Sequence, residues 1–91
     1  MTYTIKTTRK FEKDLKLAVK RGKKLELLSV VIKTLAAGKK LAPKYKDHIL
    51  NGNFADVHEC HIQPDWLLLY EIYEEELLLY LTRTGSHSDL F

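Results

Sequence analysis

Two apolar runs in the second half of the 91-residue chain constrain the fold more than any other feature. Trp66–Tyr73 is apolar at almost every position, and Glu76–Thr82 repeats that pattern after a turn at Glu74 and Glu75. A run this short and this apolar is typical of a strand that is covered on both faces. We therefore predict that Trp66–Tyr73 is a central strand, paired with Glu76–Thr82 through a tight turn.

Two further segments have strand patterns. Thr2–Thr7 alternates polar and apolar side chains and is rich in β-branched residues, and Phe54–Ile62 precedes a turn at Gln63–Asp65. Three sequential strands joined by short turns form an antiparallel meander. Because side chains alternate along a strand, Glu59 and His61 are expected to share one face.

The segment between the first two strands has the period of two helices. The first helix is predicted to follow an N-cap at Thr7 or Thr8 and to end at Gly22, and the second to end at a left-handed Gly38. Their apolar faces consist of Phe11, Leu15, Ala18 and Val19 in the first helix and Leu25, Leu28, Val31, Ile32 and Leu35 in the second. We expect the two helices to form an antiparallel hairpin.

The predicted order is β-α-α-β-β-β, an α+β fold with the helix hairpin packed on one face of a small, mainly antiparallel sheet. Residues 39–53 have no period and contain Pro43 and Gly52, so they are interpreted as a connection. With 45% apolar residues, we expect residues 1–91 to form one domain. The sequence has no signal stretch and no apolar run long enough for a bilayer, which predicts a cytoplasmic protein without a membrane partner.

Charge is divided unevenly along the chain. Residues 1–46 contain fourteen Lys and Arg but three acidic residues, a formal charge of +11, whereas residues 47–91 contain one Arg and nine acidic residues, a formal charge of −8. A lysine-rich helical surface often serves only solubility. The size of this bias favours a further role, the binding of a phosphate backbone or of an acidic protein.

Three histidines lie in different parts of the predicted fold: His48 in the connection, His61 on a strand and His87 after the last strand. A meander brings His61 and His87 to one sheet, where they can converge. Two imidazoles beside a phosphodiester suit RNA cleavage, because one takes a proton from the ribose 2′-hydroxyl and the other protonates the leaving 5′-oxygen. Arg83 or a lysine would neutralise the charge that grows on the phosphoryl oxygens. A single histidine is more often structural, so the hypothesis requires convergence.

The sequence gives no indication of a metal site. His58 and Cys60 are expected on the strand face opposite Glu59 and His61, and no other spacing of His and Cys resembles a zinc site. We therefore expect no metal and no other cofactor. Cys60 is the only cysteine, so an internal disulfide is excluded.

Four further residues have competing interpretations. Asp65 is equally consistent with function and with a turn, where aspartate is common. Trp66 and Tyr70 are expected in the core rather than as surfaces for base stacking. Phe91 is different, because a large apolar terminal residue indicates docking or stacking rather than fraying.

Three groups of residues carry a resemblance to a known family. They are Tyr45, Lys46, Asp47 and His48 with Leu50 and Gly52; Glu59, Cys60 and His61 with Pro64, Asp65 and Trp66; and Arg83, Thr84, Gly85, Ser86 and His87 with Leu90 and Phe91. In order and spacing they resemble the YafQ-type branch of the RelE/ParE toxin superfamily over essentially the whole chain. The resemblance implies a RelE-like microbial RNase fold and a bacterial type II toxin. It further implies an mRNA interferase, which is an endoribonuclease that cuts messenger RNA. In many members the cut is made at the ribosomal A site. The resemblance also implies a cognate antitoxin that silences the toxin.

The resemblance also implies site residues. The matching active-site positions are His48, His61, Asp65, His87 and Phe91, with Glu59 where relatives often have another acid and Arg83 matching a basic residue of the last strand. We favour His87 as the acid and His48 or His61 as the base. The further candidates for binding RNA phosphates, including ribosomal RNA, are Lys46 and the helix residues Arg9, Lys10 and Lys13.

Two alternatives to a nuclease are open. A ParE-like gyrase poison would have the same fold without a histidine acid and base, but it leaves the three matched histidines unexplained. A non-catalytic RNA-binding module would account for the basic helices and for Phe91. Both alternatives predict that messages stay uncut.

Overall fold

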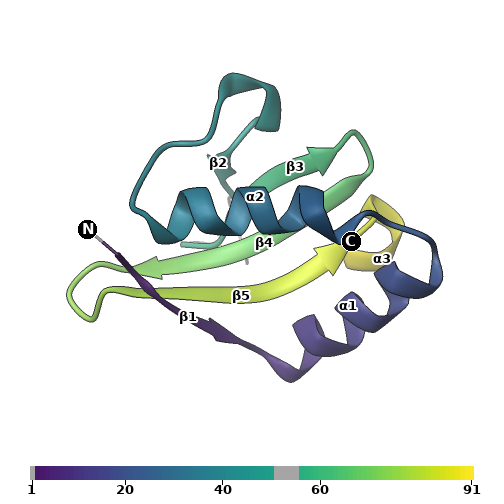
Figure 1. Ribbon diagram of the computed structural model, residues 1–91, viewed down its shortest axis with the longest axis horizontal. Helices are drawn as coiled ribbons and strands as arrows, with labels where there is room; N and C mark the ends of the chain where they lie inside the picture. The colour runs from purple at the N-terminus through teal and green to yellow at the C-terminus, as the bar shows by residue number, and fades with distance from the viewer. Residues whose placement is uncertain (1, 51–55) are drawn as a thin grey trace.

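The computed structural model describes residues 2–50 and 56–91 (Figure 1). In chain order its elements are β1 (Thr4–Thr7), α1 (Arg9–Lys20), α2 (Leu25–Ala36), the 3-10 helix η1 (Pro43–Tyr45), β2 (His48–Ile49), β3 (His58–Gln63), β4 (Trp66–Tyr73), β5 (Leu78–Gly85) and α3 (His87–Leu90). The strands form one sheet in the order β1-β5-β4-β3-β2. β1 is parallel to β5, and all other neighbours are antiparallel.

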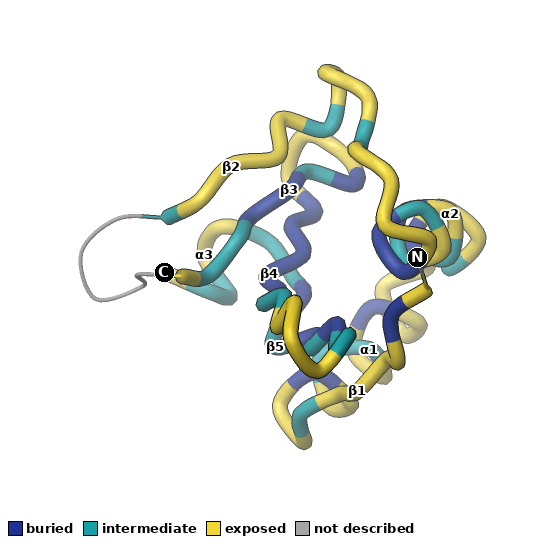
Figure 2. Tube along the Cα trace, turned by 90° about the vertical axis from the view of Figure 1, so that its left-hand side faces the viewer, coloured by how far each residue is buried: buried dark blue, intermediate teal, exposed yellow. Residues whose placement is uncertain are grey.

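The predicted α+β fold is confirmed. α1 and α2 run in roughly opposite directions across one face of the sheet, while α3 and the C-terminus lie on the other side (Figures 1 and 2). The central strand has the predicted bounds, whereas β5 runs from Leu78 to Gly85 instead of the expected Glu76–Thr82, because the turn before it also includes Glu76 and Leu77. Part of the predicted strand Phe54–Ile62 lies outside the described residues, and its described part is β3.

The core is built around β4, whose first five residues are all buried. Trp66, Leu68 and Tyr70 point toward the helices, where they join a cluster to which α1 contributes Phe11 and Ala18 and α2 contributes Leu28, Val31, Leu35 and Ala36. Trp66 and Tyr70 are therefore core residues, as predicted. Val19 was wrongly predicted on the apolar face, because its side chain is 54% exposed. At about 100° per residue, it is turned well away from neighbouring Ala18, which already faces the sheet.

Local signals explain how α1 and α2 begin and end. The hydroxyl of Thr8 accepts a hydrogen bond from the backbone N–H of Phe11 at 2.9 Å, which caps α1 as predicted. The same hydroxyl donates to the carbonyl of Thr82 at 2.7 Å and so ties the start of α1 to β5. Gly38 follows α2 in the expected left-handed conformation, with φ at +75°. No helix of the described residues is long and apolar enough to cross a membrane.

Two parts of the chain are more ordered than predicted. The connection 39–53 contains η1 and β2, which are too short to produce a periodic pattern. The chain end forms α3, whose Ser86 and Asp89 make a capping box, each side chain bonding the other's backbone N–H. The spacing of a serine and an acid three residues apart was a visible signal for this helix.

We predict that Thr84→Val destabilises the protein by about 1–3 kcal/mol, the cost of a buried unpaired polar group. The buried hydroxyl of Thr84 accepts from Trp66 Nε1 at 2.9 Å and donates to the Leu67 carbonyl at 2.7 Å. Valine keeps the shape but leaves the indole N–H without its acceptor. Urea unfolding should show a lower midpoint than wild type, and Thr4→Val, at an exposed strand position, should change it little. Equal effects of the two substitutions would contradict this account.

Candidate active site

The strand register relates four of the predicted site residues, His48, Glu59, His61 and Arg83, to one face of the sheet. Directly paired residues of antiparallel strands project to the same side. One row across the sheet consists of His48, Glu59, Leu69 and Arg83, and the next consists of His61, Leu67 and Gly85. Because Trp66, Leu68 and Tyr70 point toward the helices, both rows project from the opposite face, and from there the side chain of Arg83 reaches back to Asp14 of α1.

Glu59 is the centre of the first group of side chains. Its Oε1 lies 3.3 Å from His48 Nε2 and 3.5 Å from His61 Nε2. The carboxyl is only 6% exposed, and a carboxylate that has lost its water needs such partners. The predicted neighbourhood of Glu59 and His61 on one strand face is thus confirmed, and His48 joins them from the adjacent strand β2.

Backbone carbonyls hold the other edge of each imidazole. His48 Nδ1 is 2.7 Å from the carbonyl oxygen of Lys46, and His61 Nδ1 is 3.4 Å from that of Pro64. Each contact orients its ring with Nδ1 toward the backbone and Nε2 toward Glu59. The two rings are therefore oriented from both sides before any substrate arrives.

His48 owes its position to a buried tyrosine. Tyr70 donates from its hydroxyl to Asp47 Oδ1 at 2.5 Å, which fixes the residue that precedes His48. Burial of Tyr70, followed by its bond to Asp47, raises the pKa of the phenol and keeps it a donor. A core residue of β4 thereby sets the place of a histidine on the surface.

His87 forms the second group with Asp65. Asp65 Oδ1 accepts from the backbone N–H of His87 at 3.0 Å and from His87 Nδ1 at 2.7 Å. These two bonds, the backbone bond most, hold the pKa of Asp65 below its ordinary value. The His87 and His61 ring centroids are 5.7 Å apart, with the planes tilted by 56°. The predicted convergence of these two histidines is present.

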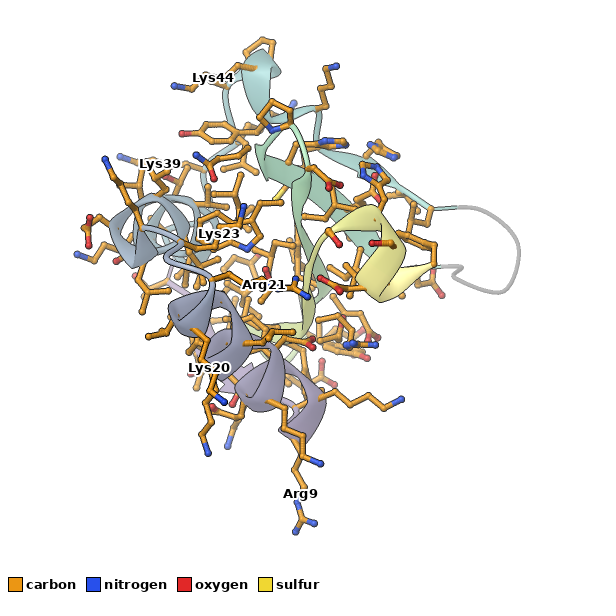
Figure 3. All side chains as sticks on the ribbon, turned by 90° about the vertical axis from the view of Figure 1, so that its right-hand side faces the viewer. Arg9, Lys20, Arg21, Lys23, Lys39 and Lys44 are labelled. Atoms are coloured by element: carbon orange, nitrogen blue, oxygen red, sulfur yellow. The ribbon has the colours of Figure 1, made fainter. Side chains whose placement is uncertain are left out.

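Asp89 anchors α3, and with it His87, to α1. Arg21 donates from both terminal nitrogens to Asp89 at 2.6 and 3.2 Å, and Arg21 turns from α1 toward α3 in Figure 3. This hydrogen bonding, together with bonds from Ser86, lowers the pKa of Asp89 well below its usual range. Gly85 is required beside it, because a Cβ there would lie 3.0 Å from the Asp89 side chain. Sequence reasoning missed Arg21 and Asp89.

Arg83 is braced rather than free. Its Nε and one terminal nitrogen donate to the two oxygens of Asp14 at 2.6 and 3.0 Å, which raises the pKa of the guanidinium. Asp14 also accepts from the backbone N–H of Thr84 at 3.2 Å. Asp14 gave no sequence signal, because it lies far along the chain from its partners.

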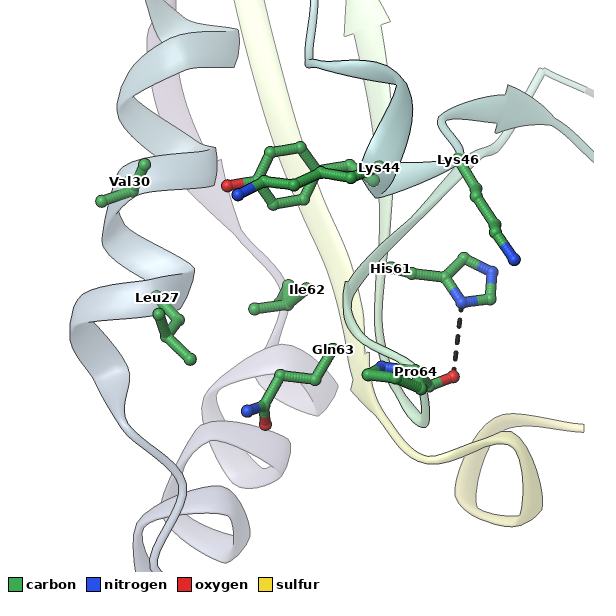
Figure 4. A pocket seen from close by; sticks show the side chains of 9 residues that line it. Leu27, Val30, Lys44, Lys46, His61, Ile62, Gln63 and Pro64 are labelled. Carbon is green, nitrogen blue, oxygen red and sulfur yellow. Dashed lines mark hydrogen bonds between the residues drawn. The ribbon is translucent and has the colours of Figure 1, made fainter.

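The remaining candidates lie in different places. Phe91 follows α3 on the same side of the sheet as the histidines and is 57% exposed (Figure 2). The side chain of Lys46 extends beside His61 (Figure 4). Arg9, Lys10 and Lys13 belong to α1, and the labelled Arg9 points outward from the start of that helix (Figure 3).

Comparison with known proteins identifies the family. A model of the YafQ family, described as the bacterial toxin of a type II toxin-antitoxin system, matches residues 3–91. The chain belongs to the YafQ family. The mRNA interferase toxin YafQ of Escherichia coli K12 is 38% identical over 82 residues, which cover 89% of this chain and 87% of that protein. The family predicted from the three groups of motifs is therefore confirmed.

Solved structures agree with this assignment. A metal-bound toxin from Helicobacter pylori is 53% identical, with a TM-score of 0.92 and both chains covered to 100%. The E. coli DinJ-YafQ toxin-antitoxin complex matches with 35% identity and a TM-score of 0.91, covering 100% of this chain and 99% of that chain. The fold of this YafQ-family toxin is thus shared with its solved relatives.

The metal in the H. pylori structure raises the question whether this YafQ-family toxin has a metal site. Within residues 2–50 and 56–91, no three side chains of His, Cys, Asp or Glu are arranged to hold an ion. Cys60 is fully buried, and burial raises the pKa of its thiol to about 12. His58 stacks on Tyr70, with centroids 4.9 Å apart. His58 and Cys60 are thus both engaged in packing.

We predict that the carboxyls of Asp65 and Asp89 titrate below the ordinary aspartate pKa of about 3.9. Because the pKa of each carboxyl is lower in the folded protein, its carboxylate stabilises the docked α3 fully at pH values above the ordinary pKa. This stabilisation is lost as pH falls through the folded pKa. Carbon-13 NMR of the carboxyls gives both midpoints. Arg21→Gln should move the Asp89 midpoint upward and leave Asp65 lowered, whereas Lys20→Gln, which removes a neighbouring charge, should move neither. If Asp89 of the wild type titrates at or above about 3.9, the proposed anchoring of α3 by the Arg21–Asp89 ion pair is wrong.

Proposed function

We propose that this YafQ-family toxin is an endoribonuclease that cuts messenger RNA by attack of the ribose 2′-hydroxyl on the neighbouring phosphate. The observation that carries the proposal is the convergence of His61 and His87, whose ring centroids are 5.7 Å apart, beside the Glu59 carboxylate and His48. The name of the E. coli relative, mRNA interferase toxin, supports messenger RNA as the target.

Proton transfer divides between the two groups of side chains. The proton of the 2′-hydroxyl passes to the cluster of His48, Glu59 and His61, with His48 or His61 as the base. The 2′-oxygen then attacks the phosphorus in line, and the bond to the 5′-oxygen breaks. His87 gives a proton to that departing oxygen, leaving a 2′,3′-cyclic phosphate and a 5′-hydroxyl. Asp65 accepts from His87 Nδ1 and so orients the ring for transfer at Nε2.

Cations near the reacting phosphate stabilise its growing negative charge. Arg83 keeps N–H groups free when two of them bond to Asp14, because a guanidinium has five donors. Lys46 contributes a second positive charge from the side of His61. Phe91, exposed at the end of α3, offers a surface on which a base can stack.

The reaction we propose requires no metal ion. The imidazoles supply both proton transfers. Cleavage should therefore survive EDTA at concentrations that strip exchangeable metal from the protein.

Two partners follow from the same assignment. The ribosome A site is the proposed place of cleavage, with the basic residues of α1 in contact with ribosomal RNA phosphates. A cognate antitoxin, like DinJ in the complex with E. coli YafQ, is proposed to cover the histidines and to silence the toxin. An acidic or amphipathic segment of the antitoxin would match the lysine-rich helices.

We predict that the purified toxin produces new 5′ ends on a translated message, and that His87→Ala reduces them by about 100-fold or more, the usual contribution of a general acid. Mapping of 5′ ends in a translation extract measures both. Glu75→Ala is the control, because Glu75 is an exposed residue between β4 and β5, at the opposite end of β5 from His87, and its loss should leave cutting nearly unchanged. Addition of the antitoxin should abolish the new ends.

Each negative result of this mapping has a distinct meaning. A wild-type toxin that leaves messages uncut would overturn the nuclease and favour a gyrase poison or an RNA-binding module. Equal cutting by wild type and His87→Ala would remove His87 from the reaction. Loss of cutting in EDTA alone, restored by added metal, would overturn the metal-free reaction.

We also predict that neutralising Arg9, Lys10 and Lys13 together to Gln weakens ribosome binding while leaving the thermal unfolding midpoint nearly unchanged. The three side chains are exposed on α1, and each lost phosphate contact should lower the dependence of log affinity on log salt by about 0.9 or less. Ribosome pelleting across salt concentrations measures this slope. Lys33→Gln on α2 is the single-charge control. Unchanged affinity and slope in the triple variant would remove α1 from the ribosome interface.

A further inference from the structure

A groove adjoins the proposed active site, and most of its lining has no role in the reaction described above. It is a cavity of about 460 Å³ between α2, η1 and the end of β3. That volume lies within the usual range for sites that bind small organic groups. Figure 4 shows its two walls, with Leu27 and Val30 of α2 on one side and Lys44, Lys46 and His61 on the other.

The lining combines flat and apolar surfaces with few polar groups. Leu27 and Val30 are 38% and 54% exposed, which leaves apolar surface open to a ligand. Tyr45 is partly buried against the core, so its ring is held in place, and Lys44 Nζ lies 5.1 Å from the ring centroid. Gln63, an exposed residue at the end of β3, contributes a side-chain amide to the lining. Such a site suits a planar group with apolar faces and a hydrogen-bonding edge.

His61 belongs to both the groove and the histidine cluster. Its Nε2 faces Glu59, and its ring also lines the groove. A phosphodiester held at His61 would therefore carry a neighbouring nucleotide directly to the groove entrance. Lys44 and Lys46 stand at the groove with the charge that a phosphate backbone requires.

We propose that this groove binds one unpaired base of the RNA next to the cleaved bond, and that Gln63 reads the edge of that base. The inference rests on the proposed nuclease function. Single-stranded RNA is recognised by stacking of exposed bases on aromatic and apolar side chains and by hydrogen bonds to their edges. Gln63 is suited to the second task because its amide both donates and accepts.

The test compares cut-site sequences of wild type and variants by mapping 5′ ends over many messages. Wild type should show a base bias at one position adjacent to the cut. Gln63→Leu should reduce that bias by about tenfold, the loss of one hydrogen-bonded base contact. Because Gln63 is exposed, its substitution should leave the thermal unfolding midpoint unchanged.

A charge in the groove gives an independent variant with a matched control. Val30→Glu puts a negative charge at the groove wall and should weaken binding of a short RNA with a 2′-deoxy scissile nucleotide, which binds but is not cut. Val19→Glu adds the same charge to α1 at a residue that is also 54% exposed, outside the groove. We expect at least a threefold larger loss of affinity from Val30→Glu than from Val19→Glu.

The outcomes separate this inference from the proposed function. If wild type does not cut, the nuclease proposal fails whatever Gln63 does. If wild type cuts and Gln63→Leu keeps the same base bias at every position, the base site is wrong. If Val30→Glu leaves RNA binding and cutting unchanged but weakens antitoxin binding, the groove is a protein docking site and the proposal is overturned.

Discussion

The burial of β4 on both faces is the constraint on which the rest of the structure depends. Its first five residues are enclosed, so each side chain must find a partner above or below the sheet. The polar tips of the two buried aromatic residues do this by bonding other segments. Trp66 donates to Thr84 near the end of β5, and Tyr70 donates to Asp47 just before β2. One strand thereby positions both segments that carry the outer histidines, because His87 follows β5 and His48 begins β2.

The buried carboxylate of Glu59 is unfavourable by itself, but it orients the two histidines that contact it. A buried carboxylate is costly unless charged or polar groups compensate it. Here the compensation comes from His48 on the neighbouring strand and His61 two residues further on the same strand. Removal of one imidazole would leave the other to compensate the charge alone. We therefore interpret the three side chains as one unit, in which His48 or His61 can accept the proton of the 2′-hydroxyl without movement of the backbone.

Much of this arrangement could be predicted from sequence, because it follows from short-range periods. Alternation along β3 was enough to put Glu59 and His61 together, and the apolar run of β4 identified the central strand. The pairs that hold Arg21 to Asp89 and Arg83 to Asp14 could not be predicted, because they join α1 to the end of the chain. Neither helix period nor strand alternation relates residues so far apart. η1 and β2 were missed because two or three residues carry no period at all.

These ion pairs change the meaning of the charge asymmetry. The two acids concerned, Asp14 and Asp89, each bond an arginine, so neither arginine is a freely mobile cation. Arg83 is instead held at one edge of its planar group. Glu59 pairs with Leu69 and Leu69 pairs with Arg83, so Arg83 lies two strands, or roughly 10 Å, from Glu59. A fixed guanidinium with donors to spare loses less freedom on meeting a phosphate than a lysine does. Asp14 therefore acts as a positioning residue: it offsets part of the positive charge of Arg83 but keeps its remaining donors in a defined direction.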